Sequence, residues 1–331
     1  MIITRTPLRV SFVGGGSDLL AFYNKAVGRV ISTAINKYVF VAINDKFDGN
    51  FRVGYSVTEI VAKPYLIQNT RVRAALQYFK VKKGLEIISV ADVPSKGTGL
   101  GSSSSFAVGL LAGLSQHLGH DLHKDRKELA EAACHLEINL LKEPIGKQDQ
   151  YAAVFGGLNM IEFHPDKVMV ESVKVSKSNL EEFKDHLLVF YTGVARSASD
   201  QLQILNKNLT TNEEKFLAQK KLADSVLVFR DKLVGGDFKS LGKILHDGWL
   251  LKKQTSNTIS NKAIDNLYNV GLKNGAWGGK LLGAGGGGFM LFLAPPRNHK
   301  KLITAFSKLR QLPIGFDNHG VKVIFNRYEY Q

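Results

Sequence analysis

The residues of this chain best suited to chemistry lie in one glycine- and serine-rich segment. It reads Lys96-Gly97-Thr98-Gly99-Leu100-Gly101 and continues with four serines, 102–105, before an apolar run begins at Phe106. Glycine at three alternate positions lets the backbone take positive φ and expose its N–H groups. Serine is a favoured N-cap, and the first N–H groups of a helix lack internal partners and carry partial positive charge. The segment therefore predicts a phosphate-binding loop at a helix start, with hydroxyl groups able to reach a metal ion.

Two familiar phosphate-binding patterns do not fit this loop. The Walker A motif ends in Gly-Lys-Ser/Thr, and the dinucleotide fingerprint has its glycines at the first, third and sixth places. Neither arrangement occurs here. The loop therefore represents a third way of wrapping an anion in backbone N–H groups.

The composition is that of an ordinary globular protein. The chain has 331 residues, 44% hydrophobic and 22% charged, which suits two modest domains with a packed core. Its one cysteine, Cys134, excludes a disulfide framework and indicates a reducing compartment. The first residues do not follow the plan of a signal peptide, and no apolar run reaches transmembrane length. We therefore expect a cytoplasmic protein, with no membrane partner, that is a monomer or a homodimer.

The charge balance is strongly basic. Lysine and arginine outnumber aspartate and glutamate by 44 to 29, which gives a formal net charge of +15. The lysines are scattered and form no dense block with interleaved aromatics, as nucleic-acid binding would favour. The balance is therefore better explained by phosphorylated small ligands than by nucleic acid.

Two further glycine clusters flank the loop. One is Gly14-Gly15-Gly16-Ser17-Asp18, shortly after Arg9, and the other lies within residues 278–289. In this order the three segments resemble the three signature motifs of the GHMP kinase superfamily, which includes galactokinase, homoserine kinase and mevalonate kinase. The resemblance spans residues 5–289. It implies an α+β fold of two domains, an N-terminal one with a left-handed βαβ unit and a ferredoxin-like C-terminal one, with the active site in the cleft between them.

The resemblance also implies ATP and Mg²⁺ as cofactors. The residues expected to bind ATP are Pro94, Lys96, Gly97, Thr98, Gly99, Leu100, Gly101, Ser102, Ser103 and Ser104. The expected metal ligands are the hydroxyl of Ser103, with Ser104 as the alternative, and the carboxylate of Glu137 on the next long helix. Mg²⁺ prefers such hard oxygens and keeps several waters. A surface glutamate on an amphipathic helix remains the alternative reading of Glu137.

The expected catalytic residues are Asp149 and Arg9. Asp149 takes the place of the aspartate that lies next to the acceptor hydroxyl in the superfamily, where a carboxylate can accept the proton of the attacking oxygen. Arg9 matches the basic residue of the first motif and can stabilise developing negative charge. A helix N-cap near Gly146 is the alternative role for Asp149.

The substrate is expected to be a phosphorylated sugar. Glycines replace the glutamate and histidine that galactokinases carry in the first motif, which argues against galactokinase itself. The motif resembles instead a branch that phosphorylates the anomeric hydroxyl of a heptose 7-phosphate, for nucleotide-activated heptose of surface polysaccharide. The residues expected to bind the substrate are Gly14, Gly15, Gly16, Ser17, Asp18, Lys147, Gln148, Arg196, Gly285 and Gly286. A tight strand entry explains the last two glycines equally well.

Two other functions stay open: a sugar 1-kinase that acts on a neutral sugar, and a binding protein of this fold without catalysis. The presence of Arg9, Ser103, Glu137 and Asp149 together argues against lost catalysis. Hydrophobic periodicity predicts strands at 2–12, 30–47, 85–90, 158–163, 187–191, 288–293 and 321–325, a strand pair at 51–61, and helices at 103–117, 214–233, 238–251, 262–274 and 300–309. A further helix is expected to start at Asp125, with Glu128 in a capping-box position and apolar residues at helical spacing up to Leu140. A polar, lysine-rich passage at 165–184 predicts two domains, residues 1–170 and 171–331.

Overall fold

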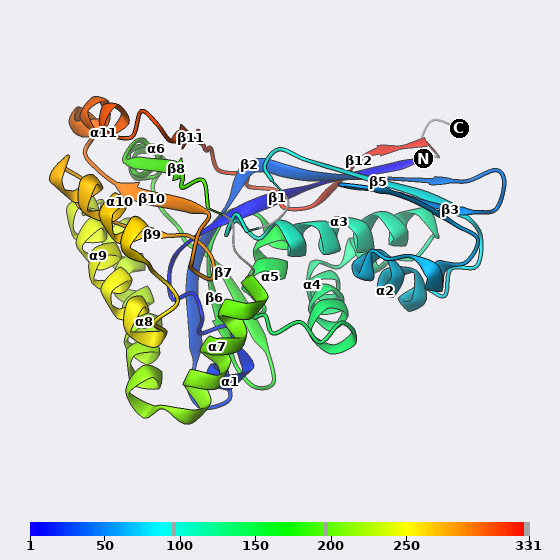
Figure 1. Cartoon of the computed structure of the whole chain (residues 1–331), viewed down its shortest axis with the longest axis horizontal. Helices are drawn as coiled ribbons and strands as arrows, with labels where there is room; N and C mark the ends of the chain where they lie inside the picture. The colour runs from blue at the N-terminus through cyan, green and yellow to red at the C-terminus, as the bar shows by residue number, and fades with distance from the viewer. Residues whose placement is uncertain (95–96, 195–197, 328–331) are drawn as a thin grey trace.

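The computed structural model describes residues 1–94, 97–194 and 198–327. Two β-sheets organise these residues into two lobes that lie side by side along the long axis of the molecule (Figure 1). The N-terminal lobe comprises the eight-stranded sheet with helices α1–α5, and the C-terminal lobe comprises the four-stranded sheet with helices α6–α11. This is the α+β, two-domain arrangement that the sequence predicts.

The eight-stranded sheet runs in the order β12-β1-β2-β5-β3-β4, and β6 and β7 extend it from β2. Its strands are β1 (Ile2–Val13), β2 (Gly28–Asp45), β3 (Phe51–Gly54), β4 (Thr58–Val61), β5 (Leu85–Ala91), β6 (Leu158–Phe163), β7 (Val168–Ser172) and β12 (Lys322–Asn326). Strands β3 and β5 pair in parallel, and helix α2 lies in the connection between them. This part of the sheet is therefore a βαβ unit, as expected.

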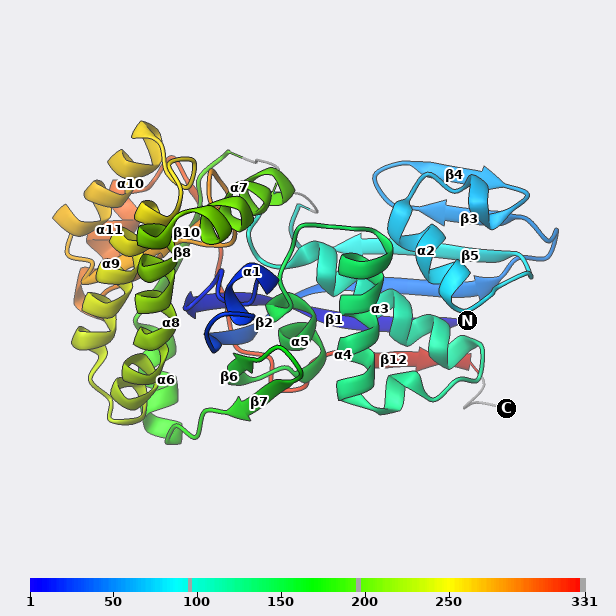
Figure 2. The ribbon, with the colours of Figure 1, turned by 90° about the horizontal axis from the view of Figure 1, so that it is seen from below.

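Helices α2, α3 and α4 cover one face of this sheet (Figure 2). The helical segments of the lobe are α1 (Leu20–Tyr23), α2 (Thr70–Tyr78), α3 (Ser102–His117), α4 (Arg126–Cys134), a π-helical turn (His135–Leu140) and α5 (Gln148–Phe155), with 3₁₀ turns at Pro64–Leu66 and Leu122–Lys124. Two glycines let α3 approach the sheet closely. A Cβ on Gly109 would stand 2.5 Å from Thr6 Oγ1, and one on Gly113 would stand 2.9 Å from Ile43 Cδ1.

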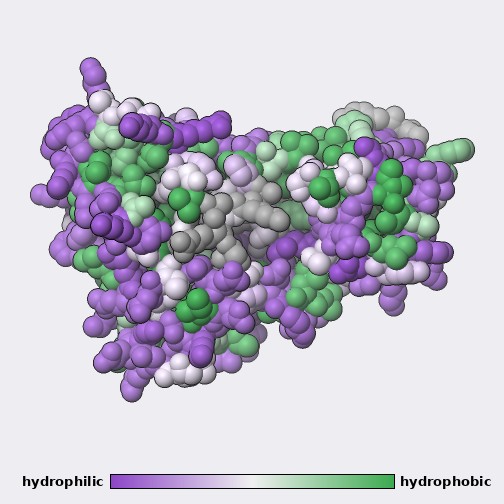
Figure 3. All heavy atoms as spheres, in the orientation of Figure 1, coloured by the Kyte–Doolittle hydropathy of each residue, from purple (hydrophilic) through white to green (hydrophobic). Residues whose placement is uncertain are grey.

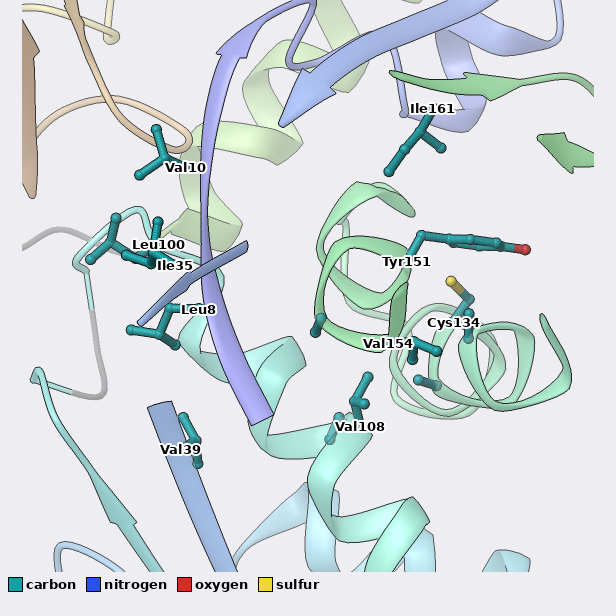
Figure 4. Packing of buried hydrophobic residues seen from close by; sticks show 14 of the residues in the cluster. Leu8, Val10, Ile35, Val39, Leu100, Val108, Cys134, Tyr151, Val154 and Ile161 are labelled. Atoms are coloured by element: carbon teal, nitrogen blue, oxygen red, sulfur yellow. The ribbon is translucent and has the colours of Figure 1, made fainter. Parts of the chain in front are cut away.

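The core of the N-terminal lobe fixes the site-bearing elements relative to one another. Figure 4 shows Leu8 and Val10 of β1 close to Leu100, and Tyr151 of α5 beside Cys134 of α4. All five side chains are buried. Because apolar packing holds β1, the start of α3 and α5 together, the polar residues that they carry have defined positions. Cys134 is a buried free cysteine that packs as a small core residue.

The four-stranded sheet has the order and connectivity of a ferredoxin-like domain. Its strands are β8 (Leu187–Tyr191), β9 (Gly278–Leu281), β10 (Phe289–Leu293) and β11 (Arg310–Gln311), arranged as β11-β8-β10-β9 and antiparallel throughout. In chain order this is the β-α-β-β-α-β motif. The helical segments are α6 (Lys177–Asp185), α7 (Ala198–Thr211), α8 (Glu213–Val234), α9 (Phe238–Thr255), α10 (Lys262–Lys273), a 3₁₀ turn (Pro296–Asn298) and α11 (His299–Ala305).

The two lobes share apolar packing and strands. The ring of Phe12 in β1 lies 5.2 Å from that of Phe183 in α6 and 5.8 Å from that of Phe229 in α8. Strand β12, near the C-terminus, returns to pair with β1. The division of the chain near residue 170 stays a prediction. In the described part of the chain, no helix is both long and apolar enough to cross a membrane.

Most strands and long helices predicted from periodicity are present within a few residues of the expected bounds. The predicted helix over 300–309 is shorter, since α11 ends at Ala305. Helices α1, α2, α5, α6 and α7 and strands β7, β9 and β11 were not predicted. Short amphipathic segments such as α5 carry too few apolar positions to show a helical period on their own.

Candidate active site

The glycine-rich loop takes the backbone conformation that its sequence predicts. Gly97, Gly99 and Gly101 have φ values of 69°, 74° and 77°, which side chains with a Cβ rarely adopt. The predicted serine N-cap of α3 is wrong, because Gly101 occupies that position and no side chain caps the helix. Ser102 Oγ instead lies 3.2 Å from Thr98 Oγ1. The first N–H groups of α3 are therefore left without a side-chain acceptor, which suits an anion.

A cavity lies between the lobes at the start of α3, where Figure 3 shows the surface hollowed. From the N-terminal lobe it is lined by Arg9, Ser11, Gly15, Gly16, Asp18, Gly97, Thr98, Gly99, Gly101, Ser102, Ser103, Ser104, Ile145, Gly146, Gln148 and Asp149. From the C-terminal lobe it is lined by Leu202, Leu205, Lys252, Lys280, Gly283 and Ala284. All three glycine-rich segments therefore contribute to one cavity, which we call the transfer cavity.

A second cavity in the N-terminal lobe meets the transfer cavity at Ser102 and Ser103, which line both. Its other lining residues are Val39, Tyr55, Ser56, Gln68, Asn69, Thr70, Arg71, Ser89, Val90, Ala91, Val93 and Phe106. Of the four serines at the start of α3, Ser103 is the exposed one, and Ser104 is buried. Two joined cavities with a helix start between them can hold a nucleotide, with its phosphates at the helix and its base in the second cavity.

Arg9 and Asp149 form a bidentate ion pair in the transfer cavity. The distances are 2.8 Å from Arg9 Nε to Asp149 Oδ1 and 2.8 Å from Nη2 to Oδ2. Arg9 Nη1 also donates to the carbonyl of Gly99 at 2.5 Å. A Cβ on Gly101 would stand 3.3 Å from both Arg9 Cγ and Asp149 Oδ2, so glycine gives the pair its space. The two residues predicted to be catalytic therefore lie together against the glycine-rich loop before α3.

Asp18 lies nearby and is 3% exposed. It accepts hydrogen bonds from the backbone N–H of Gly16 at 3.0 Å and of Gln148 at 3.2 Å. Burial, and secondly the charge of Asp149, raise the pKa of the Asp18 carboxyl. Its fit requires glycine at position 146, since a Cβ there would stand 1.9 Å from Asp18 Oδ2. The first glycine motif and the segment that precedes α5 are therefore fitted to each other.

Two buried polar atoms in this part of the cavity lack partners within the described residues. They are Ser11 Oγ and Gln148 Oε1, and both residues line the transfer cavity. A buried polar group without a hydrogen bond costs stability, so such atoms are often completed by a ligand. Together with Asp18 they form a polar wall suited to sugar hydroxyls. Ser11 was not predicted as a site residue, because one serine within a strand has no distinctive sequence pattern.

Two lysines of the C-terminal lobe also line the cavity and were missed by sequence reasoning. Lys252 of α9 is 7% exposed and Lys280 of β9 is 6% exposed. Lys280 donates to the carbonyls of Ser11 and Phe12 at 3.0 and 2.9 Å, which ties the third glycine segment to the first. Burial, then Lys252 and Arg9, place the pKa of Lys280 well below that of a free lysine. A lysine amid the small and apolar residues of β9 was the available signal.

Glu137 is fully buried on the π-helical turn after α4. Its Oε1 accepts from Arg71 Nε at 2.9 Å, and its Oε2 accepts from Gln150 Nε2 at 2.7 Å. Arg71 also lies 3.5 Å from Glu143, whose other oxygen accepts from Ser199 Oγ at 2.9 Å. Glu137 is therefore paired inside the protein, which excludes the alternative that it is a surface glutamate.

The surroundings of Glu137 suit a hard cation such as Mg²⁺. Gln150 Oε1 is buried without a partner in the described part of the chain, so a carboxylate and an unsatisfied amide oxygen lie in one network. Ser103 adds an exposed hydroxyl at the junction of the two cavities. Oxygen donors of this kind are those that Mg²⁺ takes. Arg71 lines the second cavity and donates to one oxygen of the Glu137 carboxylate.

Several predicted binding residues have other contacts in the structure. Ser17 Oγ exchanges hydrogen bonds with the backbone of Arg29, and the ammonium of Lys147 lies 4.9 Å from the ring of Tyr23. Neither residue lines the transfer cavity. Gln219 of α8 donates to the carbonyl of Gly14 at 3.4 Å, so this glycine turn is supported from the other lobe.

Other predicted residues do not line the transfer cavity either. The N–H of Gly286 donates to the carbonyl of Ile259, and a Cβ on Gly285 would also meet Ile259. Gly283 and Ala284, from the same segment, line the cavity in their place. Pro94 and Leu100 also lie outside the lining, Leu100 as a core residue. Lys96 and Arg196, both predicted to bind ligand, lie outside the described residues.

Family models match both halves of the chain. The GHMP kinases N terminal domain matches residues 67–157, and the GHMP kinases C terminal domain matches residues 229–310. A D-glycero-alpha-D-manno-heptose 7-phosphate kinase of Campylobacter jejuni is 30% identical over 97% of this chain and 98% of its own length. A bifunctional fucokinase/GDP-fucose pyrophosphorylase of Arabidopsis thaliana is 27% identical over 87% of this chain but 29% of its own length.

Solved structures share the fold. A D-glycero-D-manno-heptose 1-phosphate kinase from Bacteriodes thetaiotaomicron superposes with a TM-score of 0.81 at 24% identity, over 98% of this chain and all of the other. A Lactococcus lactis galactokinase in complex with galactose gives a TM-score of 0.76 at 16% identity, over 98% and 95% of the two chains. At these identities the structural matches establish the fold.

Proposed function

The chain belongs to the GHMP kinase family and is an ATP-dependent small-molecule kinase, and we propose that its acceptor is the anomeric hydroxyl of D-glycero-D-manno-heptose 7-phosphate. The product would be the 1,7-bisphosphate. The observation that carries the proposal is the transfer cavity, in which the Arg9–Asp149 pair, the start of α3 and the polar wall around Asp18 face one space. The sugar is suggested by the full-length similarity to the Campylobacter jejuni kinase.

The charges of the cavity agree with two phosphorylated ligands. Its lining carries three basic side chains, Arg9, Lys252 and Lys280, against the two carboxyls of Asp18 and Asp149. Burial and the neighbouring Asp149 raise the pKa of Asp18, which disfavours its charged form. Burial also lowers the pKa of Lys252 and of Lys280, and a bound phosphate would favour the charged form of both lysines. A cavity of this balance attracts a nucleotide triphosphate and a sugar phosphate together.

Phosphoryl transfer at this site requires few covalent steps. The anomeric oxygen attacks the γ-phosphorus of ATP, and a new O–P bond forms. The bond from that phosphorus to the β,γ-bridging oxygen breaks, and ADP keeps the electron pair. Asp149 accepts the proton of the attacking hydroxyl. Arg9 fixes the direction of the Asp149 carboxylate through two hydrogen bonds and supplies positive charge near the γ-phosphate.

We assign the metal position to Ser103 and Glu137. A bound Mg²⁺ would neutralise phosphate charge and orient the triphosphate. The guanidinium of Arg71 contacts Glu137, so a cation can bind this carboxylate only if Arg71 gives up part of that contact. The hydroxyl of Ser103 needs no such rearrangement, since it is exposed.

ADP release measured across a panel of sugars and sugar phosphates tests the proposal. We expect turnover with heptose 7-phosphate and a value of kcat/KM at least tenfold lower with the unphosphorylated heptose, since one charge-assisted contact is worth about 1.5–3 kcal/mol. Equal use of neutral sugars would replace the proposal with a neutral sugar 1-kinase, which the similarity to a fucokinase also allows. Nucleotide binding without ADP release from any acceptor would indicate a non-catalytic binding protein.

A further inference from the structure

Lys252 is a buried cation whose place in the molecule is not explained by stability. It is 7% exposed on helix α9, and within the described residues it pairs with no carboxylate. Its ammonium donates one hydrogen bond, to the carbonyl of Gly283 at 2.5 Å. An ammonium has three N–H donors, so two are left over. Burying a charge with so few partners is costly, and such costs are characteristic of functional sites.

The position of Lys252 is defined by two touching glycines. Gly283 packs so closely on the phosphate loop that a Cβ there would stand 2.4 Å from Gly99 Cα. Arg9 donates to the carbonyl of Gly99, and Lys252 donates to the carbonyl of Gly283, both at 2.5 Å. The two cations are thus anchored on two adjoining glycine segments, one from each lobe.

This anchoring puts Lys252 beside the phosphate loop and the Arg9–Asp149 pair, where the transferred group must pass. Lys280 lies close by, but its ammonium is engaged with the carbonyls of Ser11 and Phe12. Lys147, predicted to bind the substrate, lies over the ring of Tyr23. Of these lysines, Lys252 alone combines an anchor on the third glycine segment with unused donors that face the transfer cavity.

We propose that Lys252 is a further catalytic residue, whose ammonium contacts the phosphoryl group as it passes from ATP to the acceptor oxygen. It forms no covalent bond and transfers no proton. Together with Arg9 it compensates the charge that develops on the phosphoryl oxygens, from a position that its bond to Gly283 fixes before the reaction. The proposal rests on the phosphoryl transfer described above but not on the identity of the sugar.

The first test replaces Lys252 by methionine, which keeps the length of the side chain and removes the charge. We expect kcat to fall about 10²- to 10³-fold, as when one preorganised donor is removed from an active site, while the KM values for ATP and sugar change little. The matched control is Lys253→Met. Lys253 is the next residue of α9 but pairs with Asp265 at 3.1 Å outside the cavity, so kcat should stay within about twofold of wild type.

The second test separates catalysis from structure through thermal unfolding. Removing a buried, unpaired charge should raise the Tm of Lys252→Met by roughly 2 °C or more. Lys280→Met should instead lower Tm, because it removes two hydrogen bonds that join the first and third glycine segments. A lower Tm in Lys252→Met, with kcat reduced only in proportion to unfolded protein, would show a structural role and overturn the proposal.

The pH dependence gives a third readout. Burial, and secondly Arg9, lower the pKa of Lys252 to about 8. The other charged groups that face it are Asp18, Asp149 and Lys280. Since the charged form is the active one and kcat/KM reports the groups of the free enzyme, kcat/KM of the wild type should decline as pH rises through about 8, and Lys252→Met should lack this decline. In the unfolded chain the lysine keeps its proton to higher pH. Above about pH 8 the free energy of unfolding of the wild type should therefore rise relative to that of Lys252→Met.

The outcomes of these experiments separate a failure of the Lys252 proposal from a failure of the proposed acceptor sugar. If the wild type releases ADP with some other sugar, the acceptor proposed above is wrong, and Lys252→Met is assayed with that sugar. If Lys252→Met keeps its kcat but loses affinity for phosphorylated acceptors, Lys252 binds the remote phosphate of the substrate and the inference is wrong. Activity equal to wild type would also overturn it.

Discussion

The two arginine–carboxylate pairs of the site present opposite members to the ligand cavities. In the Arg9–Asp149 pair the arginine is 4% exposed and the carboxylate 22% exposed. In the Arg71–Glu137 pair the carboxylate is fully buried, and the arginine is 20% exposed and lines the second cavity. Two similar ion pairs can therefore serve different chemistry. In the first pair, Asp149 offers the cavity an oxygen that can accept a proton. In the second pair, Arg71 lies between the cavity and the buried carboxylate of Glu137.

The comparison predicts that the exposed carboxylate matters most for turnover. Asp149→Asn keeps the size of the side chain but removes the proton acceptor and its charge, so kcat should fall about 10²-fold or more. Binding of ATP should change little, because the phosphate loop is built from backbone. Steady-state kinetics and nucleotide titration measure the two effects. Activity within about threefold of wild type would remove Asp149 from the mechanism.

The buried carboxylate should matter for the metal instead. Glu137→Gln keeps the hydrogen-bonding shape but loses the charge that a cation needs, so the Mg²⁺ concentration for half-maximal activity should rise about tenfold or more. Nucleotide affinity should weaken with Mg²⁺ present and stay the same with EDTA. A superimposable Mg²⁺ titration would assign Glu137 a structural role, as the partner of Arg71 and Gln150.

The first pair can also be disturbed without changing its charges. In Gly101→Ala the new Cβ would stand 3.3 Å from both Arg9 Cγ and Asp149 Oδ2, so the pair has to shift and kcat should fall about tenfold. The left-handed backbone adds about 1–2 kcal/mol of destabilisation.

Gly119→Ala is the matched control, because Gly119 has φ of 74° but no atom within 4 Å of a Cβ. It should lose similar stability in urea unfolding and keep its activity. Equal loss of kcat in both variants would mean that backbone strain, and not the displaced ion pair, reduces turnover.

The smallest effect is expected at Arg71, the exposed member of the second pair. Arg71→Gln leaves Glu137 with Gln150 as its hydrogen-bond donor and should lower Tm by a few degrees without metal. Mg²⁺ should restore more of the Tm in the variant than it adds to the wild type, because it replaces the missing cation. Arg73→Gln, on the same helix but bonded to the carbonyl of Ile67, is the control. An equal Mg²⁺ effect on both variants would contradict a metal site at Glu137.

The sequence predicted which segments contribute to the candidate site better than it predicted the contacts between their residues. The φ values of Gly97, Gly99 and Gly101 agree with the prediction because a left-handed backbone is a local property of glycine. The pairing of Arg9 with Asp149 could be expected only through family resemblance, since the two residues are 140 positions apart. The serine cap was wrong because propensity favours serine there, whereas the loop geometry left that position to Gly101.

By itself the sequence determined the left-handed glycines of the loop before α3 and the kinase motifs, because each of these depends on residue types at short spacing. The α+β class followed from the resemblance that these motifs carry. Tertiary structure alone decided that Lys147 lies over Tyr23, that Glu137 is paired with Arg71, and that Lys252 enters the transfer cavity. These outcomes depend on which surfaces meet when the two lobes pack. The sequence does not distinguish a lysine whose ammonium reaches solvent from one that contacts an aromatic ring or a buried carbonyl. Which of these it contacts depends on the groups that the folded chain brings within the length of its side chain.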